Sequence, residues 1–230
     1  MDILEHPSPN FNARREGATP DMVVLHYTGM ETAEAALARL SEPEFEVSAH
    51  YLIAPDGRIW ALVAEEMRAW HAGRGAWGGV EDVNSRSIGI ELQNNGLEPF
   101  SAPLMTRLEA LLAALLARWN IPVERVIGHS DLAPDRKIDP GARFDWGRLA
   151  RGGLAVGPVM TEEPREADEA EFMQWAQCFG YRGEFEHVLG AFRLRFCPWA
   201  GGLPLRGGDV AMIRELATRY PHLDAPDFSI

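Results

Sequence analysis

The apolar run Met22–Leu25 constrains the fold more than any other part of this 230-residue chain. An unbroken apolar run, rather than an alternating one, is typical of a strand that is buried on both faces of a sheet. Helices predicted at 32–40 and 103–119 alternate with further strands. Those strands are predicted at 48–53, 59–63, 87–92 and 126–128. The pattern therefore indicates an α/β fold with a central β-sheet flanked by helices.

The last third of the chain has a different pattern. Glycine, proline and acidic residues interrupt the order of strands and helices, which predicts a linker at 158–167. This divides the chain into a first domain at 1–157 and a second at 168–230. Three short amphipathic segments, at about 167–179, 185–196 and 208–220, predict a small three-helix domain in the second part.

Composition excludes several functions. The net charge of −12 and the pI near 5.0 argue against nucleic acids and anionic membrane surfaces as partners. No apolar run is long enough for a transmembrane segment, and the first residues lack the pattern of a signal peptide. We therefore expect a cytoplasmic protein, or a periplasmic one if an export signal is missing from this sequence. Cys178 and Cys197 are expected to be buried free thiols, with one disulfide as the alternative.

The segment 127–141 carries the strongest chemical signal. We interpret it as a short strand that runs into an exposed loop, with His129 at the strand end and Lys137 and Asp139 in the loop. Residues two apart in an extended segment point the same way, so Lys137 and Asp139 are expected to face one site. Together with His26, which ends the first strand, His129 and Asp139 form a catalytic zinc pattern with a fourth position for water. The residues alone leave open the alternative that each histidine is an ordinary core residue.

Five segments together resemble the zinc-dependent type 2 N-acetylmuramoyl-L-alanine amidases. This superfamily includes the AmpD and AmiD amidases, the T7-type lysozymes and the peptidoglycan recognition proteins. The similar segments are 24–28, 48–53, 69–73, 84–92 and 127–141. Residues 175–220 are similar to the peptidoglycan-binding-like helical domain that follows the catalytic domain in AmiD-type enzymes. The resemblance implies an amidase-type mixed sheet followed by this three-helix domain.

The resemblance also implies residue roles. His26, His129 and Asp139 match the ligands of one Zn²⁺ per chain. Glu91 matches the general base, and Lys137 matches the residue that stabilises the transition state. His71 and Asn84 match positions that line the substrate groove, and we expect Tyr27 and Trp77, the latter in a glycine-rich loop, to contact substrate as well. His50 is expected to be structural. These ten residues lie in the first domain.

The implied activity is hydrolysis of the amide that joins the lactyl group of N-acetylmuramic acid to L-alanine. The partners would be anhydro-muropeptides or peptidoglycan of the bacterial cell wall, and the role would be cell-wall recycling. The alternative is a non-catalytic peptidoglycan-binding protein, which loss of a zinc ligand would indicate. One departure is Asp82, which stands where many relatives have an arginine. Either Arg86 or Arg74 reads the peptide stem instead, or this protein recognises the stem differently, and both alternatives stay open.

Overall fold

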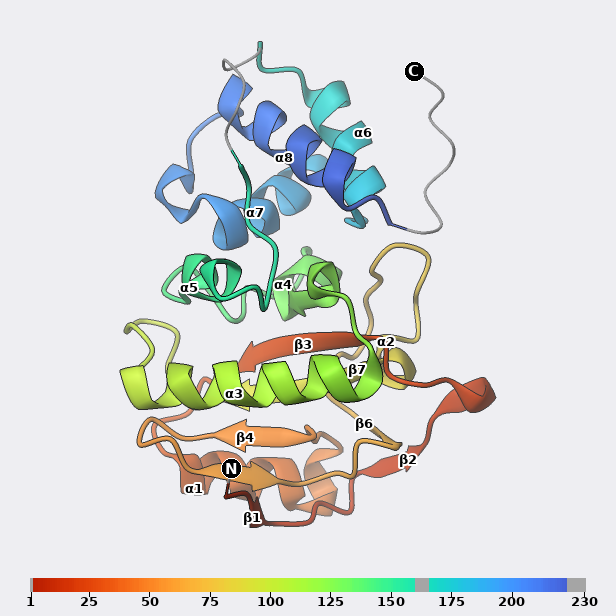
Figure 1. The fold of residues 1–230 in the computed structure, drawn as a ribbon, viewed down its shortest axis with the longest axis vertical. Coiled ribbons are helices and arrows are strands. Elements are labelled where there is room, and N and C mark those ends of the chain that lie inside the picture. The colour runs from red at the N-terminus through yellow and green to blue at the C-terminus, as the bar shows by residue number, and fades with distance from the viewer. Residues whose placement is uncertain (1, 160–165, 223–230) are drawn as a thin grey trace.

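A six-stranded mixed sheet forms the centre of the computed structural model, which describes residues 2–159 and 166–222 (Figure 1). Strand β3 (Met22–Tyr27) lies between the parallel strands β7 (Ser87–Leu92) and β8 (Val126–Gly128). The remaining strands are β1 (Leu4–Glu5), β4 (Tyr51–Ile53) and β5 (Ile59–Ala61) in this sheet, and β2 (Phe11–Ala13) and β6 (Met67–Ala69) in a two-stranded sheet. The predicted α/β fold is confirmed, although β4 and β5 are shorter than predicted.

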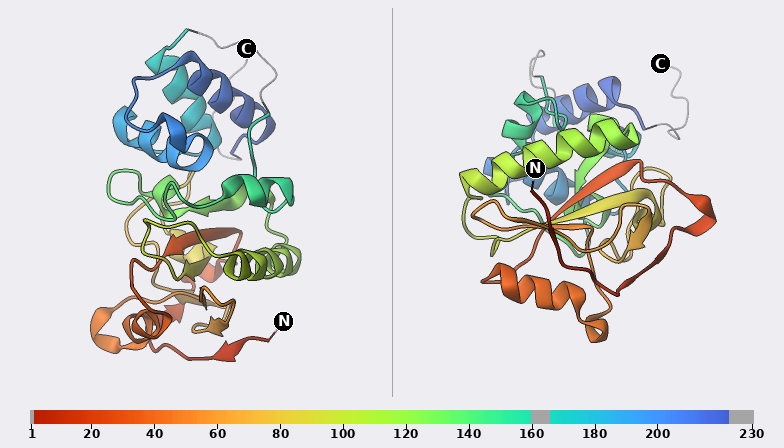
Figure 2. Two further views of the ribbon diagram at one scale, coloured as in Figure 1. Left: turned by 90° about the vertical axis from the view of Figure 1, so that its left-hand side faces the viewer. Right: turned by 60° about the horizontal axis from the view of Figure 1, so that its bottom comes forward.

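Two helices cover opposite faces of this sheet (Figure 2). Helix α3 (Ala102–Trp119) begins at Ser101, whose hydroxyl accepts a hydrogen bond from the Leu104 amide. Its leucines pack against Ile88 and Ile90 of β7. Helix α1 (Ala33–Ser41) covers β4 and β5 with the stripe of Ala33, Ala36, Leu37 and Leu40, the residues that the sequence pattern predicts.

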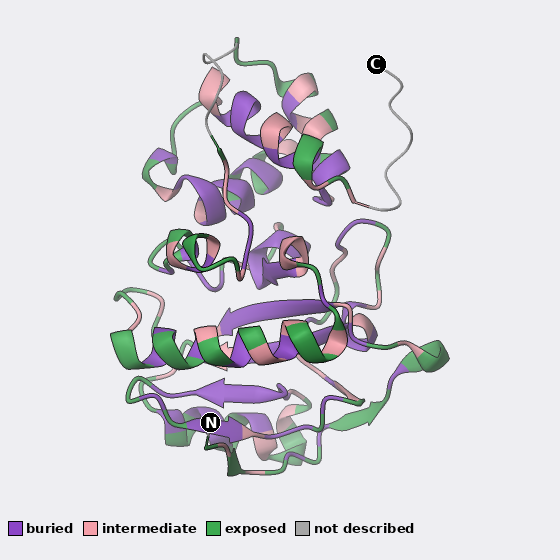
Figure 3. Cartoon of the chain, viewed as in Figure 1, coloured by how far each residue is buried: buried purple, intermediate pink, exposed green. Residues whose placement is uncertain are grey.

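Six further helices complete the described chain, of which the last three correspond to the predicted C-terminal helices. They are α2 (Val83–Arg86), α4 (His129–Leu132), α5 (Trp146–Arg151), α6 (Glu169–Phe179), α7 (Phe185–Phe196) and α8 (Gly207–Arg219). Short 3₁₀ turns cover Arg15–Gly17, Pro43–Phe45, Val123–Arg125 and Pro198–Ala200. One expectation is wrong in part: the segment after β8 begins as helix α4, whose four residues are all buried, and the partly exposed loop starts only at 133 (Figure 3).

Helices α6–α8 lie at one end of the molecule, beyond α4 and α5 (Figure 1). Their apolar side chains, including Phe172 and Phe192, belong to one continuous core with Val24 of β3 and Ile127 of β8. The predicted linker at 158–167 lies mostly outside the described residues, and the division of the chain into two domains stays a prediction. The C-terminal helices therefore complete the core on one side of the sheet.

A buried ion pair ties α7 to α4. The Asp131 carboxylate accepts hydrogen bonds from the Tyr181 hydroxyl at 2.6 Å, from Arg195 at 2.9 Å and from the Gly128 amide at 2.8 Å. Arg195 also donates to the Val126 carbonyl at 2.9 Å. Burial and the Asp131 charge raise the pKa of Tyr181 well above its usual value, so its hydroxyl keeps its proton. We refer to Asp131, Tyr181 and Arg195 as the Asp131 cluster.

The structure also addresses two expectations drawn from composition. Cys178 and Cys197 are both buried and free, which confirms the expectation of two thiols. Burial raises the pKa of Cys197 to about 12, so this sulfur stays a thiol at neutral pH. Across residues 2–159 and 166–222, no helix combines the length and the apolar composition that crossing a membrane requires.

Candidate active site

The carboxyl ends of β3, β7 and β8 meet at one edge of the sheet, which is where α/β proteins commonly bind ligands. The register pairs His26 of β3 with Glu91 of β7, so these side chains point to the same face of the sheet. His129 follows β8 directly, as the first residue of α4. Strand pairing therefore brings together three predicted residues that are far apart in the sequence.

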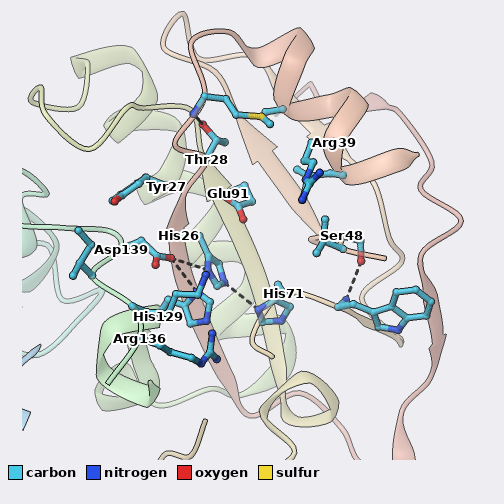
Figure 4. A pocket seen from close by; sticks show the side chains of 17 residues that line it. His26, Tyr27, Thr28, Arg39, Ser48, His71, Glu91, His129, Arg136 and Asp139 are labelled. Atoms are coloured by element: carbon cyan, nitrogen blue, oxygen red, sulfur yellow. Dashed lines mark hydrogen bonds and ion pairs between the residues drawn. The ribbon is translucent and has the colours of Figure 1, made fainter. Parts of the chain in front are cut away.

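A cavity of about 380 Å³ opens at this edge (Figure 4). Its walls come from β3, α1, the segments around Ser48 and Trp70, and the segment after α4. Among its lining residues are His26, Tyr27, Arg39, His71, Glu91, His129, Arg136, Lys137 and Asp139. The cavity thus gathers most of the residues that the sequence predicts to be functional.

The metal-ligand cluster consists of His26, His129 and Asp139, which lie together and are buried. The Nδ1 atoms of the two histidines are 2.9 Å apart. Oδ2 of Asp139 lies 3.0 Å from His26 Nδ1 and 3.1 Å from His129 Nδ1. Three potential ligand atoms therefore converge on one point. Whether they can bind a cation depends on which ring nitrogens of the two histidines carry protons.

The tautomer of His129 follows from its other ring nitrogen. Nε2 lies 2.9 Å from the Ala72 carbonyl oxygen, which can only accept a hydrogen bond. Nε2 of His129 must therefore carry the proton in the neutral ring. Its Nδ1, which faces Asp139, is left with a lone pair.

A chain of hydrogen bonds fixes His26 in the same way. The Ser87 hydroxyl donates to the Val83 carbonyl at 2.6 Å, so its oxygen accepts from Nε2–H of His71 at 3.1 Å. Nδ1 of His71 is then an acceptor, and it receives the proton of His26 Nε2 at 3.0 Å. Nδ1 of His26 is therefore also left with a lone pair.

Two lone pairs and a carboxylate oxygen thus face one another without a proton between them. Burial and the proximity of His129 lower the pKa of His26 to about 4, which favours its neutral ring. The pKa of Asp139 lies below its usual value, so this carboxyl is ionised. Acceptors held this close repel one another unless a cation lies between them. The two nitrogens and one oxygen therefore fit a metal ion with an open position.

Close packing holds His71 against the sheet. A Cβ atom on Gly89 of β7 would lie 2.5 Å from the His71 ring, so only glycine leaves room for it. Oδ1 of Asn84 accepts hydrogen bonds from the backbone amides of His71 at 3.1 Å and Ala72 at 2.8 Å. Asn84 is buried and is not among the cavity-lining residues. The arrangement supports a role in positioning His71 rather than the predicted direct contact with substrate.

Glu91 faces the same cavity with an incompletely bonded carboxyl group. Its Oε2 is buried and accepts no hydrogen bond from the described residues. Burial, together with the negative charge of Asp139, raises the pKa of Glu91 to about 8, and Lys137 opposes part of this shift. A carboxyl group with a pKa close to neutral can both take up and release a proton at physiological pH.

The structure separates the other predicted residues. Tyr27 and Lys137 line the cavity, whereas Trp77 does not. The Trp77 ring is 4 % exposed and packs edge-on against Phe179 and Tyr181 of the C-terminal region. Its position does not support direct contact with substrate in this cavity, because the C-terminal helices cover it. His50, fully buried and bonded to the Gly89 amide, lies outside the cavity as expected.

Neither arginine that was expected to read a peptide stem reaches the cavity. Arg86 pairs with Asp21, and Arg74 pairs with Asp135 at 2.6 Å. The cavity is lined instead by Arg39 of α1 and by Arg136, which follows α4. Sequence analysis missed both, because nothing in the pattern of α1 indicates that its last turn borders the strand ends.

Comparison with known proteins agrees with this geometry. The family model for N-acetylmuramoyl-L-alanine amidase matches residues 16–142. The amidase AmiD of Escherichia coli K12 is 39 % identical over an alignment covering 85 % of this chain and 83 % of AmiD. The 1,6-anhydro-N-acetylmuramyl-L-alanine amidase AmpD of the same strain is 35 % identical, covering 62 % of this chain and 87 % of AmpD.

Solved structures give the same result over nearly the whole chain. The complex of E. coli AmiD with anhydro-N-acetylmuramic acid-L-Ala-D-γ-Glu-L-Lys superposes with a TM-score of 0.81 at 31 % identity, covering 92 % of this chain and 93 % of AmiD. AmpDH3 from Pseudomonas aeruginosa gives 0.80 at 27 % identity, covering 92 % and 96 %. Sequence, fold and the cluster at the strand ends agree, and the chain belongs to the N-acetylmuramoyl-L-alanine amidase family, with similarity to AmiD over most of its length.

Proposed function

We propose that this amidase uses one Zn²⁺, held by His26, His129 and Asp139, to hydrolyse the bond between the lactyl group of N-acetylmuramic acid and L-alanine. The observation that carries this proposal is the convergence of two imidazole lone pairs and an ionised carboxylate in a cavity. Two nitrogens and one oxygen with an open position are a donor set that catalytic zinc sites use. An intact ligand set disfavours the alternative of a non-catalytic binding protein.

Glu91 and Lys137 each have a role in this reaction. A bound Zn²⁺ supplies Lewis-acid chemistry, which polarises a carbonyl oxygen and makes water more acidic. Glu91, with its raised pKa, takes the proton of the attacking water and delivers it to the leaving amine of L-alanine. Lys137 borders the same cavity, where its ammonium stabilises the developing negative charge on the former carbonyl oxygen. Losing one such group typically costs about 10²–10³ in rate.

The hydrogen bonds of His71 support a role in orienting the metal ligand His26. Its Nδ1 accepts the proton of His26 Nε2, and its Nε2 donates to Ser87. Partners of this kind orient a metal-binding imidazole and fix its tautomer. His71 therefore prepares His26 for the metal ion, and its exposed edge lines the cavity beside the substrate.

The substrates that we propose are small anhydro-muropeptides, with intact peptidoglycan as a second substrate. Support comes from the AmiD relative, whose structure contains an anhydro-muramoyl tripeptide, and from the AmpD relatives, whose names specify the 1,6-anhydro substrate. A role in cell-wall recycling would follow, and we propose the cytoplasm as its location. Fractionation of the source cells tests that location, since an enzyme found in the periplasm would contradict it.

The deciding experiment assays the full chain on the anhydro-muramoyl tripeptide and on intact peptidoglycan in parallel. Each assay is run on the purified protein, after chelation, and after addition of Zn²⁺ to the chelated sample. We expect release of free tripeptide from the small substrate, loss of release after chelation, and recovery with zinc. The bound metal is measured by elemental analysis in every sample.

The outcomes separate the parts of the proposal. Release that survives complete removal of metal contradicts the zinc assignment. Release from peptidoglycan at a rate comparable with the small substrate makes the polymer a principal substrate and argues against a recycling role alone. No release from either substrate by a zinc-loaded protein contradicts the enzymatic function and favours the binding-protein alternative.

A further inference from the structure

Three cationic side chains line the cavity, and their hydrogen bonds distinguish them. Arg136 is held in place by backbone carbonyls, since it donates to Ala72 at 2.5 Å and to Arg74 at 2.7 Å. Lys137 lies two residues from the metal ligand Asp139. Arg39 lies on another wall, in the last turn of α1, and its guanidinium points toward the cavity (Figure 4). Arg39 is therefore a cavity cation that has no role in the reaction and that no backbone carbonyl of the described residues holds.

The Arg39 guanidinium is held by an aromatic ring and not by a carboxylate. Its central carbon lies 3.9 Å from the centroid of the Phe45 ring. Three glutamates follow closely in the sequence, at 42, 44 and 46, yet no carboxylate among the described residues forms an ion pair with Arg39. The charge is thus oriented and has no protein counter-ion within the described chain.

A guanidinium stacked on a ring keeps its N–H groups free, because these lie in its plane and point away from the stacking axis. Such an edge matches the two oxygens of a carboxylate, and the pre-orientation by Phe45 reduces the entropy lost on binding. The apolar residues Met30, Leu40 and Val47 line the same cavity. This surface suits a ligand with an apolar chain and a carboxylate at a fixed position.

We propose that Arg39 binds a carboxylate of the peptide stem and makes the enzyme prefer stems with that free carboxylate over amidated ones. The inference rests on the proposed function and adds a specificity-determining residue to it. In a muramoyl tripeptide of the L-Ala-D-γ-Glu-L-Lys type, the γ-linkage leaves the α-carboxylate of glutamate free, and the lysine carries a terminal carboxylate. These are the two groups that Arg39 can select.

The test uses three anhydro-muramoyl tripeptides with the wild-type protein and Arg39→Met. One substrate has both carboxylates, and each of the others has one of them converted to a carboxamide. For the wild type, we expect amidation of one carboxylate to lower kcat/KM about 3- to 10-fold, mainly through KM, because Arg39 is exposed and solvent screens its charge. In Arg39→Met the ratio of kcat/KM between the unmodified and the amidated substrate should fall close to one, since methionine keeps an apolar side chain but lacks the charge.

Two further variants serve as controls. Arg58 also stacks on an aromatic ring, at 4.9 Å from Trp60, and pairs with Asp56 away from the cavity. Arg58→Met removes the same charge from the protein and should keep the wild-type preference. Arg39→Lys keeps the charge without the planar edge and should give an intermediate preference that weakens as salt is added.

The possible results separate this inference from the proposed function. A wild-type protein that hydrolyses none of the three substrates contradicts the proposed function itself. Active wild-type protein with no preference for either carboxylate, or a preference that persists in Arg39→Met, overturns the role of Arg39. An equal loss of preference in Arg58→Met also overturns it, because a general effect of protein charge would then explain the result.

Discussion

Two buried clusters of polar side chains adjoin helix α4, and they differ in how their charges are balanced. His129 begins this helix and belongs to the metal-ligand cluster with His26 and Asp139. Asp131, two residues later, belongs to the Asp131 cluster with Tyr181 and Arg195. Each cluster contains a buried aspartate and at least one partner from an element far away in the sequence.

The Asp131 cluster is balanced within the protein. Its carboxylate receives three hydrogen bonds from a hydroxyl, a guanidinium and a backbone amide, and the pair of Asp131 and Arg195 is almost completely buried. The negative charge of Asp131 is therefore matched by the positive charge of Arg195 inside the protein, although Nε of Arg195 is buried without a hydrogen bond from the described residues. Such a buried, charge-balanced pair is a structural feature, and breaking it leaves a buried charge without a partner.

The metal-ligand cluster lacks hydrogen-bond donors, because the three ligand atoms that face one another are all acceptors. The hydrogen bonds of His129 to Ala72 and of His26 to His71 place both imidazole protons on the far sides of the rings. The Asp139 oxygen therefore faces lone pairs, and the nearby Glu91 has a buried oxygen without a hydrogen bond. The comparison teaches that the location of protons, more than the presence of buried charge, distinguishes a site for a cation from a structural ion pair.

The largest difference should appear on removing each aspartate. Asp139→Ala is expected to weaken metal binding by more than about 100-fold, because even groups that only support a ligand contribute 10–100-fold. Activity should fall to the background of the assay, while the metal-free protein remains folded. Elemental analysis, the assay and thermal unfolding measure the three quantities. Retention of stoichiometric zinc by this variant would mean that the ligand set is wrong.

The Asp131 cluster should respond in the opposite way. Asp131→Asn leaves Arg195 buried without its counter-charge and is expected to cost about 3–5 kcal/mol of stability. For a chain of this size, that lowers Tm by about 6–20 °C. Asp56→Asn is the matched control, because its pair with Arg58 is exposed and should contribute no more than about 1 kcal/mol. Equal effects of the two substitutions on Tm would contradict the structural role of the buried pair.

The smallest effect on stability is expected for Glu91→Gln, and its sign should be favourable. The pKa of Glu91 is about 8 in the folded protein against an ordinary 4.5, so the folded state binds more protons between these values. The stability of the metal-free protein therefore falls as pH rises from about 4.5 to 8 on account of this group. Glutamine removes that cost, with an expected gain of about 0.5–2 kcal/mol at pH 8 and little gain at pH 4.

The same Glu91→Gln variant should keep its zinc and lose about 10²–10⁴ in rate, since glutamine cannot take up the proton of water. Chemical denaturation at several pH values measures stability, and the tripeptide assay measures the rate. A pH-independent difference in stability between variant and wild type would show that Glu91 is not held with a raised pKa. Turnover close to that of the wild type would remove it as the general base.

The sequence by itself determined the main strands and helices and the three residues of the metal-ligand cluster. The apolar run of β3, the stripes of α1 and α3 and the three C-terminal helices all follow from local patterns of burial, which periodicity records. The family resemblance then selected His26, His129 and Asp139 from among the histidines and acidic residues. These ligands belong to short motifs at strand ends, so the motifs carried the information.

Only the tertiary structure decided what lies around that cluster. Trp77 is covered by the C-terminal helices, Asn84 accepts hydrogen bonds from the backbone next to His71, and Arg39 borders the cavity. The local sequence does not predict these positions, because each depends on how distant elements pack. The tautomers of the two ligand histidines likewise depend on Ala72, His71 and Ser87. Local sequence patterns record which faces are buried, but they do not record which buried partner a polar group will meet. That choice depends on packing between elements, which the three-dimensional fold determines.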